Sequence, residues 1–396
     1  MEIKGFINPM PQFIGKFMIN LSMENPDYLI VGAGFYGSVL AERLASERGA
    51  SVVVIDKRSH IGGNCYSEFD QETEIEFHKY GTHIFHTNSK KVFQYLSLFT
   101  EFNSYHHQVL TTHKGKVFQM PINLETINSF FGVNLKPFEV ANFLDKLKSK
   151  ETYENPKNLE EKAISLVGRE LYEAFIKDYT QKQWQKDPKD LPASIINRLP
   201  VRSNYDESYF NNGRYQGIPL NGYTEIFKRM LNHKNIKVML NTDYFDLKNK
   251  IIPKVKTIYS GPIDRYFNYQ FGKLEWRSVR FEKNIVAHDD YQGTSVMNFA
   301  DGALPYTRIH EPKHLHPERT YSKDKTLLLY EYSEKNEDEP YYPVATTPNK
   351  ELLAKYQSLA KKEEGVLFGG RLGTYSYYDM DQVIAQALKD FESFKS

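Results

Sequence analysis

The first part of the chain alternates between short apolar runs and apolar residues at helical spacing. Tyr28–Val31 is an apolar run that ends at Gly32 and predicts a buried strand. Between residues 39 and 45 apolar side chains recur at helical spacing, and Ser51–Ile55 is a second, β-branched run. A strand, a helix and a strand within about thirty residues predict a βαβ unit. Because such a unit joins parallel strands, we expect a parallel sheet.

The middle of the chain has a helical pattern. From Ile122 to about Arg198, apolar residues recur three and four positions apart, which predicts a block of helices. The segment 185–200 is rich in proline and is expected to be a loop.

The later chain is rich in predicted strands. Short apolar runs recur at 236–240, 255–259, 284–286 and 326–332. Earlier in the chain, Thr111–Met120 predicts a hairpin that turns at Lys114 and Gly115. The tail predicts a strand, a glycine turn and a helix over Met380–Phe391.

Length and charge narrow the class of protein. The chain has 396 residues, more than one hydrophobic core usually serves, so we expect two or three domains. The formal net charge of +1 gives no reason to expect a nucleic-acid partner or binding to an anionic membrane. No apolar run approaches the roughly 18–20 residues of a membrane span.

The single cysteine and the N-terminal sequence indicate in which cellular compartment the protein is expected. With only Cys65, no intramolecular disulfide can form, and a reducing, cytoplasmic location is expected. The N-terminus lacks the apolar core and cleavage site of a signal peptide. Because Met23 begins the run that leads into the first strand, residues 1–22 are interpreted as an extension or a start-site artefact, without function.

A dinucleotide-binding motif follows the first strand. Residues 32–37 read GAGFYG, a GxGxxG pattern in which Gly32 makes the tight turn, Gly34 admits a pyrophosphate and Gly37 lets helix pack on strand. Asp56 ends the second strand, where an acid binds ribose hydroxyls. The alternative is a glycine turn that only packs helix on sheet, which the strand–turn–helix context disfavours.

Two further glycine pairs favour FAD over NAD. Gly62 and Gly63 follow Asp56 closely and leave room for a large ring system to cross the backbone. The late motif GGRLGTYSYYDMD, residues 369–381, places a glycine turn before a helix N-terminus, which can bring backbone amides near an isoalloxazine ring.

The sequence now resembles bacterial UDP-galactopyranose mutases, over essentially residues 27–392. The resemblance is carried by many motifs in one order. They are VGAGF (31–35), HIGGN (60–64), HIFHT (83–87), ELYEAF (170–175), KQW (182–184), LPASI (191–195), RLPVR (198–202), PYTRI (305–309), PYYP (340–343) and GRLGTY (370–375).

The resemblance implies an α/β fold with a Rossmann-like FAD-binding domain, a helical domain and an antiparallel β-sheet domain. The FAD-binding domain is expected to be discontinuous, over 24–104, 217–262 and 362–396. The helical domain is expected over 122–200, with 185–200 as a mobile lid. The sheet domain is expected over 105–121, 201–216 and 263–361.

The resemblance also implies an activity. It is the redox-neutral interconversion of UDP-galactopyranose and UDP-galactofuranose, with N5 of reduced FAD as the nucleophile at the sugar C1. A homodimer, a flavin reductant of unknown identity and a role in cell-surface polysaccharide synthesis are implied as well.

By the same resemblance, site residues can be named. Catalytic roles fall on Arg198, Arg308 and His86. Cofactor contacts fall on Gly32, Gly34, Phe35, Gly37, Asp56, Lys57, Gly63, Asn64, His83, Arg371 and Met380. Substrate contacts fall on Phe175, Tyr179, Thr180, Trp184, Arg198, Tyr209, Arg308, Tyr342, Tyr377 and Asp379. Arginine suits a diphosphate because its guanidinium binds oxyanions with two hydrogen bonds.

The two histidines of YGTHIFHT, residues 80–87, could suggest a metal site. We expect this stretch to be extended, so that His83 and His86 point to opposite faces and cannot readily share an ion. No metal is expected. By resemblance His86 lies beside the flavin, where we expect it to tune the reduced ring rather than act as an obligatory base.

Three positions depart from the family pattern, and two rival functions stay open. Thr82 stands where proline is frequent, Ile176 where a phenylalanine is frequent, and His107 where an asparagine is usual. These changes leave open UDP-N-acetylgalactosamine as a substrate.

The two rival functions are a flavin oxidoreductase of the amine-oxidase type and a non-catalytic binder of nucleotide sugars.

Overall fold

The computed structural model describes residues 25–198, 200–210, 213–335 and 339–394, without the side chains of residues 197 and 198. The expected extension at 1–22 lies outside the described residues. The side chain of Arg198 lies outside them too.

A five-stranded parallel sheet forms a nucleotide-binding unit. Its strand order is β16-β10-β1-β2-β9, and every pairing is parallel. The two predicted apolar runs form interior strands of this sheet. Interior strands of a parallel sheet are covered on both faces, which suits their apolar, β-branched side chains. The bounds are β1 (Tyr28–Val31), β2 (Val52–Ile55), β9 (Ile236–Met239), β10 (Lys256–Tyr259) and β16 (Val366–Phe368).

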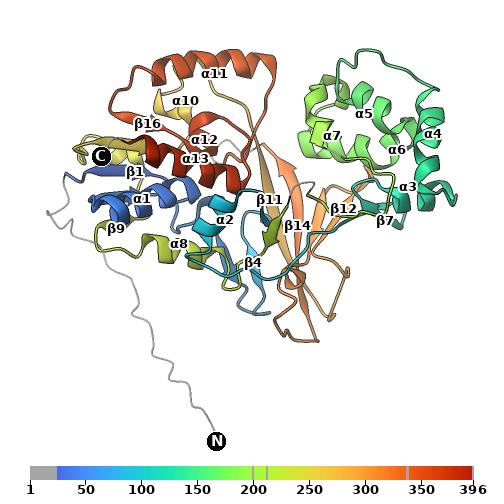
Figure 1. Ribbon diagram of the computed structural model, residues 1–396, viewed down its shortest axis with the longest axis horizontal. Coiled ribbons are helices and arrows are strands. Elements are labelled where there is room, and N and C mark those ends of the chain that lie inside the picture. Colours follow the sequence, from blue (N-terminus) through green and yellow to red (C-terminus); the bar gives the residue numbers. More distant parts are fainter. Residues whose placement is uncertain (1–24, 199, 211–212, 336–338, 395–396) are drawn as a thin grey trace, which may run out of the picture.

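Helices cover this sheet on both faces. The largest apolar core of the unit joins α1, α8 and α13 to β1 and β2. Figure 1 shows α10, α11 and α12 above the sheet in that view, and α8 below it. The helices are α1 (Phe35–Arg48), α2 (Lys90–Leu96), α8 (Tyr223–Leu231), α9 (Tyr244–Leu247), α10 (Ile263–Tyr266), α11 (Thr347–Ala360), α12 (Gly370–Thr374) and α13 (Met380–Ser393).

The predicted helical block is a separate body, drawn in green in Figure 1. It has its own apolar core, with Ile127, Leu144, Ile164 and Leu171 all buried. Its elements are α3 (Leu124–Phe131), α4 (Pro137–Lys148), α5 (Leu159–Val167), α6 (Arg169–Leu171), a π-helical turn (Tyr172–Lys177) and α7 (Asp178–Trp184).

The segment 185–200 is more ordered than the predicted loop. It contains two short 3-10 helices, η4 (Pro188–Asp190) and η5 (Ala193–Arg198). Leu191 and Ile196 are buried in the core of the helical unit, at 2% and 8% exposure. Because both side chains are apolar, their burial in this core fixes the segment at these two positions. A lid that moves as a whole would therefore move with the helical unit, or expose these side chains.

A seven-stranded sheet connects the two bodies. Its order is β15-β11-β14-β13-β12-β6-β7. The expected antiparallel arrangement holds for its pairings except that of β12 with β6, which is parallel. The long connection between β6 and β12 makes a parallel pairing possible. The strands are β6 (Val109–His113), β7 (Lys116–Met120), β11 (Trp276–Val286), β12 (Val296–Phe299), β13 (Arg308–His310), β14 (Thr326–Glu334) and β15 (Tyr342–Pro343).

The predicted hairpin is present as β6 and β7, with Lys114 and Gly115 at positive φ in its turn. The remaining pairs are β3 (Ser67–Phe69) with β4 (Glu76–His78), and β5 (Phe85–Thr87) with β8 (Tyr215–Gly217). Among the described residues, every helix is too short or too polar to cross a membrane. The predicted fold class is confirmed, while the domain boundaries stay a prediction.

Candidate active site

The glycine turn after β1 is built for close approach. Gly32 has φ +106°, and a Cβ on Gly37 would lie 2.0 Å from the Gly32 carbonyl oxygen. The Asp56 carboxylate holds the turn, because its Oδ2 accepts from the Ala33 amide at 2.8 Å and its Oδ1 from the Arg58 amide at 2.9 Å. Each oxygen keeps a lone pair with which it can accept a ribose hydroxyl.

The start of α1 fits a phosphate group. Its N-cap, Gly34, offers no side chain to the first amides, and the first turn carries no acidic residue. These amides and the helix dipole favour an anion. A Cβ on Gly63 would lie 3.1 Å from the Gly34 Cα, so the two glycine turns pack together without side chains between them. The described residues therefore fit a dinucleotide cofactor.

Three further residues predicted to contact the cofactor are Phe35, Asn64 and Met380. Phe35 is buried, with its ring 4.6 Å from that of Phe227, and therefore supports the turn from the core. Asn64 accepts from Arg58 Nη1 at 2.9 Å. Met380, the first residue of α13, packs against the same core as Phe35.

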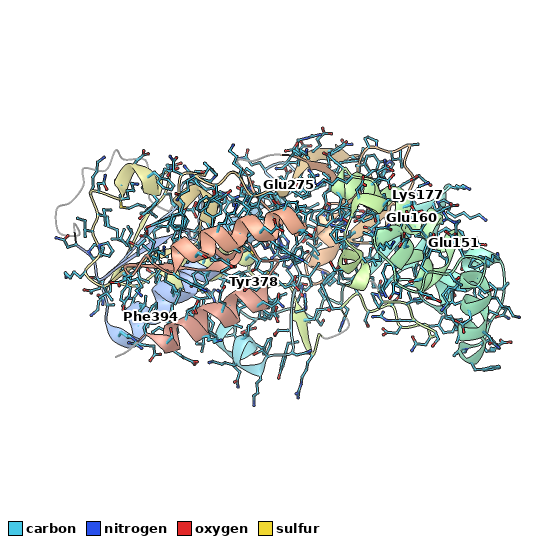
Figure 2. All side chains as sticks on the ribbon, turned by 90° about the horizontal axis from the view of Figure 1, so that it is seen from above. Glu151, Glu160, Lys177, Glu275, Tyr378 and Phe394 are labelled. Atoms are coloured by element: carbon cyan, nitrogen blue, oxygen red, sulfur yellow. The ribbon has the colours of Figure 1, made fainter. Side chains whose placement is uncertain are left out.

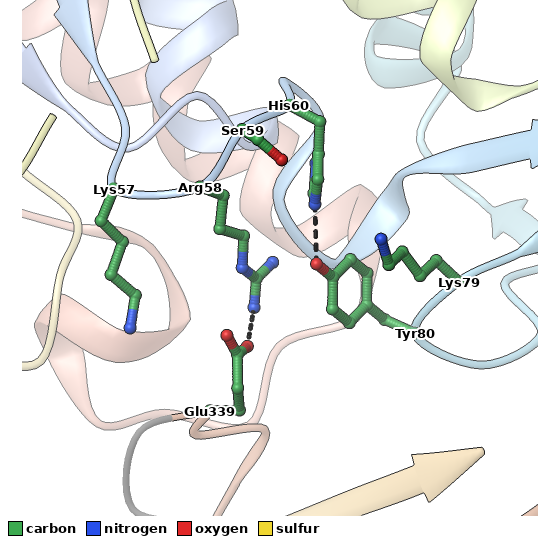
Figure 3. Close-up of a pocket in the computed structure, with 7 residues that line it drawn as sticks. All are labelled: Lys57, Arg58, Ser59, His60, Lys79, Tyr80 and Glu339. Atoms are coloured by element: carbon green, nitrogen blue, oxygen red, sulfur yellow. Dashed lines mark hydrogen bonds and ion pairs between the residues drawn. The ribbon is translucent and has the colours of Figure 1, made fainter. Parts of the chain in front are cut away.

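Lys57 is exposed and lines a pocket of about 300 Å³. Figure 3 shows the rest of its lining, including the ion pair of Arg58 with Glu339 and the hydrogen bond between His60 and Tyr80. The Arg58 guanidinium also lies 4.2 Å from the centre of the Tyr80 ring. Arg58 thereby ties the cofactor loop at Asn64 to the segment that leads into β15.

The Tyr36 side chain explains why the tail motif has glycine at position 369. A Cβ on Gly369 would lie 2.0 Å from the Tyr36 hydroxyl oxygen, which donates to Asp390 of α13 at 2.7 Å. The tail and the first glycine turn are therefore packed directly on each other. Asp379 is the N-cap residue of α13, and its amide donates to Gln382 Oε1 at 2.9 Å.

Arg371 joins two tyrosine-bearing segments. Its guanidinium donates to the carbonyls of Tyr341 at 3.3 Å and Tyr378 at 2.5 Å. It lies 5.7 Å from the Tyr342 ring centre and 5.5 Å from that of Tyr377, and these two rings stack 5.5 Å apart. The structure thus brings together Arg371, Tyr342 and Tyr377, three of the predicted residues.

Arg308 begins β13 and faces the same region. Its Nη1 lies 3.3 Å from Glu331 Oε1 on β14, and its Nε donates to Asn298 Oδ1 at 3.2 Å. Burial alone would raise the pKa of Glu331, but Arg308 and a hydrogen bond from His310 lower it to about 2. Burial opposes the charge of Arg308, yet Glu331 holds its pKa well above the ordinary value. Arg308 is therefore a fixed cation.

A hydrogen-bonded chain continues from Glu331 toward the histidine loop. His310 Nε2 lies 2.9 Å from Glu331 Oε2, and His310 Nδ1 lies 2.7 Å from the Thr82 hydroxyl. If Nε2 donates to the carboxylate, neutral His310 accepts at Nδ1 from Thr82. The threonine that departs from the family pattern thus connects the loop before His83 to Arg308.

The α7 helix carries three of the predicted substrate contacts, Tyr179, Thr180 and Trp184. The Tyr179 ring centre lies 5.8 Å from the Arg308 guanidinium, and its buried hydroxyl has no hydrogen-bond partner among the described residues. Thr180 is buried, and Trp184 packs partly on the helical core. Phe175 lies deeper, with its ring 5.1 Å from Phe118 in that core. The departing residue Ile176 is also buried there.

Lys182 fixes α7 to the turn before Arg308. Its Nζ donates to the carbonyls of Phe299 at 2.7 Å, Asp301 at 2.9 Å and Tyr306 at 3.0 Å. One turn earlier, Asp178 accepts from the Gly302 amide at 3.2 Å. Both contacts join the helical unit to the seven-stranded sheet, and they set Tyr179 opposite Arg308.

His83 and His86 lie in separate surroundings. His83 Nδ1 lies 2.6 Å from the Gly81 carbonyl, and burial lowers the pKa of His83 to about 4. His86 is the middle residue of β5, and its ring stacks on Phe210 at 3.7 Å. Burial lowers the pKa of His86, against the opposing effects of Asp379 and Asp381. Only residues 85–87 of the predicted extended stretch form a strand.

The third departing position, His107, lies close by. It is 6% exposed, and burial lowers its pKa to about 3, with Arg308 as the second cause. Its ring lies 5.1 Å from Tyr209 and 5.8 Å from Phe210. Tyr209, a predicted substrate contact, is itself 41% exposed.

One group of possible metal ligands occurs among the described residues, and it includes neither His83 nor His86. It consists of Asp290, Glu311 and His314. The buried Glu311 accepts from the amides of Tyr291 at 3.1 Å and Gln292 at 2.9 Å and from a threonine hydroxyl. Since its oxygens anchor this loop, a structural role accounts for the cluster.

Comparisons with known proteins agree with this geometry. A family model described as UDP-galactopyranose mutase matches residues 174–377, and one described as an NAD(P)-binding Rossmann-like domain matches residues 30–99. A Klebsiella pneumoniae protein named "Probable UDP-galactopyranose mutase" is 43% identical over 374 residues, which cover 94% of this chain and 96% of that protein.

This chain belongs to the UDP-galactopyranose mutase family. The resemblance in the motifs is thereby confirmed, as is the expectation of a mutase enzyme. A second relative, named dTDP-fucopyranose mutase, from Escherichia coli, is 40% identical over 375 residues, 91% of this chain and 96% of that protein. A relative named for another nucleotide sugar is therefore almost as similar to this chain.

Solved structures support the fold. A structure entitled "Crystal structure of reduced UDP-Galactopyranose mutase" matches with a TM-score of 0.73 at 16% identity, over 93% of each chain. A putrescine oxidase matches with a TM-score of 0.52 at 13% identity, over 93% of this chain and 98% of that one. Family membership implies a flavin cofactor.

Several residues of this site were missed by the sequence analysis. Glu331 stands in a strand of leucines and tyrosines, and a charged residue in a buried run is a usable signal. Lys182 and His310 gave no such signal, because their partners are distant in the sequence. The predicted role of Arg198 cannot be placed on the site, since its side chain lies outside the described residues.

Proposed function

We propose that this chain catalyses the flavin-dependent, redox-neutral interconversion of UDP-galactopyranose and UDP-galactofuranose. The observation that carries the proposal is the position of Arg308. Arg308 is a fixed cation 5.8 Å from the ring centre of Tyr179 of the helical unit, and its charge also acts on Tyr342, whose ring centre lies 5.7 Å from Arg371 of the nucleotide-binding unit. A diphosphate held there would join a base on α7 to a sugar at the cofactor. The name of the 43% identical relative supports the same sugar nucleotide.

The cofactor we propose is FAD in its reduced form. The uncapped start of α1, the paired glycine turns and Asp56 suit its pyrophosphate and ribose. When bound, reduced flavin would supply the N5 lone pair as a nucleophile toward the sugar C1, with UDP as the leaving group. The reductant that maintains this state is not identified by the chain.

The residues of the chain have three tasks in this reaction. Arg308, held by Glu331, binds the diphosphate both in the substrate and after it has left the sugar, so that UDP stays in place. Arg198, on the proposed lid 185–200, is proposed as the second cation. Lid closure would keep water from the reacting sugar.

The remaining substrate contacts follow from their placement. Tyr179, Thr180 and, from the core behind them, Phe175 form the proposed uracil site, and Trp184 is proposed to pack near the sugar or ribose. Tyr209, Tyr342, Tyr377 and Asp379 are proposed to contact the phosphates and the sugar. His86, neutral near pH 7 because burial lowers its pKa, is proposed to hydrogen-bond at the flavin rather than to remove a substrate proton.

A second nucleotide sugar, dTDP-fucopyranose, is the alternative substrate. It is favoured by the 40% identity to a relative of that name. UDP-N-acetylgalactosamine is a further alternative, because His107, Ile176 and Thr82 depart from the pattern near the site. We further propose a cytoplasmic homodimer whose product is used for surface polysaccharide.

The test is a conversion assay on the purified yellow protein. UDP-galactofuranose is incubated with and without dithionite, products are separated by chromatography, and hydrogen peroxide is measured in parallel. The proposal predicts conversion to UDP-galactopyranose only with reduced flavin. Peroxide without isomerisation would instead indicate an oxidase of the amine-oxidase type, and binding without either would indicate a non-catalytic binder.

The same assay separates the substrates. Equal concentrations of UDP-galactofuranose, dTDP-fucofuranose and UDP-N-acetylgalactosamine in its furanose form are compared by kcat/KM. The proposal requires the first to be preferred. Preference for the dTDP sugar would replace the substrate but keep the reaction type.

A further inference from the structure

A buried histidine uses both of its ring nitrogens to join distant segments of the chain. His310 ends β13 and is 2% exposed. Its Nε2 lies 2.9 Å from Glu331 Oε2 on β14, and its Nδ1 lies 2.7 Å from the hydroxyl of Thr82, which is 228 residues away in the sequence. Because both nitrogens are engaged, the ring cannot turn without breaking a hydrogen bond.

The charge of Glu331 fixes the direction of these hydrogen bonds. Burial alone would raise the pKa of Glu331, but Arg308 and His310 lower it to about 2, so the carboxylate is ionised near pH 7 and can only accept. His310 therefore donates from Nε2, and in the neutral ring Nδ1 accepts from the Thr82 hydroxyl. The hydrogen bonds run from Thr82 through His310 to the counter-ion of Arg308.

The loop that carries Thr82 also packs against the seven-stranded sheet. A Cβ on Gly81 would lie 3.1 Å from Cζ of Phe281 on β11. The Phe281 ring centre lies 5.7 Å from that of His310. The loop thus meets the sheet at two neighbouring points, one polar and one apolar, and a movement of His310 would be passed to it through both.

On its other side, the same loop is attached to the nucleotide-binding unit. The amide of His83 donates to Nδ1 of His78 on β4 at 2.9 Å. The His78 ring lies 5.1 Å from that of Tyr223, the first residue of α8, which covers the parallel sheet. His83 is itself a predicted cofactor contact, so this loop links the seven-stranded sheet to the proposed flavin site.

The contacts from Arg308 to this loop cross the junction of the two units. Figure 2 shows the helical unit, labelled at Lys177, on the opposite side of the molecule from Phe394 at the end of α13. The seven-stranded sheet, which carries Arg308 and His310, connects the two. A protein-borne coupling between a ligand at Arg308 and the cofactor therefore has to pass through this sheet.

We propose that His310 is a positioning residue that couples anion binding at Arg308 to the position of loop 80–83 at the flavin. An anion at Arg308 shares the guanidinium with Glu331, so the carboxylate accepts more strongly from His310. A stronger bond at Nε2 makes Nδ1 a better acceptor for Thr82, and the loop is held more tightly. The inference deepens the proposed function and rests on it in placing a diphosphate at Arg308 and flavin at the loop.

Such a coupling is reciprocal. Because the proposed reaction needs nucleotide and reduced flavin in one complex, we expect both to favour the same position of the loop. UDP then binds more tightly to the reduced than to the oxidised protein, and by the same free energy it raises the flavin midpoint potential. A ten-fold ratio of the two Kd values corresponds to about 30 mV for a two-electron couple.

The experiment compares holoenzymes of the wild type and of variants on either side of the Thr82–His310 hydrogen bond. Thr82→Val removes the hydroxyl and keeps the branched shape, whereas Thr82→Ser keeps the hydroxyl. His310→Gln and the double variant Thr82→Val/His310→Gln complete a cycle. The control is Thr87→Val, because the buried Thr87 hydroxyl, later in the same stretch, donates to Asp381 Oδ2 at 2.9 Å rather than to His310.

Four quantities are measured for each protein. They are the flavin content, Tm without added nucleotide, the Kd of UDP for the oxidised and for the anaerobically reduced protein, and the midpoint potential with and without saturating UDP. A merely structural hydrogen bond would lower Tm, and it would leave the ratio of the two Kd values and the UDP-induced change in potential as they are in the wild type.

For Thr82→Val we expect bound flavin and a Kd of UDP for the oxidised protein within about two-fold of wild type, since Arg308 keeps Glu331. The ratio of the two Kd values should fall toward one, and the UDP-induced rise in potential by half or more. Thr82→Ser should restore both. The double variant should lose no more coupling than His310→Gln alone, because both changes break the same chain.

Three results would overturn the proposal. They are a wild-type potential that UDP leaves unchanged, a wild-type shift retained by Thr82→Val, and an equal loss of the shift in Thr87→Val. Should Thr82→Val fail to fold, Thr82→Ala decides by the same readings. A wild type with the expected shift but without isomerisation would refute the proposed function and leave this inference standing.

Discussion

Arg308 and Glu331 face each other across the pairing of β13 with β14, with Nη1 of Arg308 3.3 Å from Glu331 Oε1. The carboxylate is 5% exposed and also accepts from His310 and Thr307. This relationship makes Arg308 rigid as well as charged. In the proposed reaction, it lets one cation hold UDP before and after the sugar has left.

Glu331→Gln should weaken both the fold and the binding of UDP. Removing one charge of a buried pair costs about 3 kcal/mol in the free energy of unfolding. We expect the Kd of UDP to rise about ten-fold, because Arg308 loses its anchor. Glu334→Gln, on the same strand and more exposed, is the control and should change neither quantity in the same way.

The pH dependence of this variant gives a separate check. The pKa of Glu331 is lowered from 4.5 to about 2 in the folded protein, so its stabilising effect is full above 4.5 and is lost as pH falls toward 2. The difference in unfolding free energy between wild type and Glu331→Gln should shrink between pH 6 and pH 3. A difference that stays constant over this range would contradict the ion pair.

Lys182→Met should loosen α7 from the turn before Arg308. Three carbonyls would lose their shared donor, and we expect a loss of about 2 kcal/mol in unfolding free energy. UDP affinity should fall as well, because Tyr179 and Arg308 are no longer held opposite each other. Lys177→Met, at an exposed position on the adjoining π-helical turn, serves as the control. Equal effects of the two variants would refute the proposed positioning role.

The sequence predicted those parts of the fold that depend on local patterns. The apolar runs gave β1 and β2, and the Lys114-Gly115 turn gave the β6–β7 hairpin. The glycine motif and Asp56 belong to one βαβ unit, so their place at one nucleotide site could be predicted, although their direct hydrogen bond was not. Contacts between distant segments could not, because periodicity carries no information about which strand pairs with which. Lys182 with Phe299 and Arg277 with Tyr342 are of this kind.

His86→Ala should reduce turnover and shift the flavin midpoint potential while retaining bound flavin. Because burial lowers the pKa of His86 below 6.5, its protonation should not appear as a step in the activity profile between pH 6.5 and 8. The measurements are kcat against pH and spectroelectrochemical titration, with the exposed His106→Ala as control. A variant with full turnover and an unshifted potential would remove His86 from the mechanism.

Trp184 should report the proposed lid. It ends α7 directly before the segment 185–200, so closure over UDP would change its surroundings. The second tryptophan, Trp276, is buried against Tyr375, and a Trp276→Phe background removes its signal. In that background, we expect a saturable fluorescence change with UDP. No change, with UDP binding verified by calorimetry, would argue against a moving lid.

The central claim is that this family member isomerises a UDP-sugar on reduced flavin without net oxidation. The most direct measurement is the initial rate of conversion of UDP-galactofuranose to UDP-galactopyranose by one preparation of holoenzyme, oxidised or reduced with dithionite. With oxygen excluded, the account predicts rapid conversion by the reduced protein and little by the oxidised protein. In air, the oxidised protein should form no peroxide when the sugar nucleotide is added. Equal rates in both states, or no conversion by a fully reduced protein that binds UDP, would contradict it.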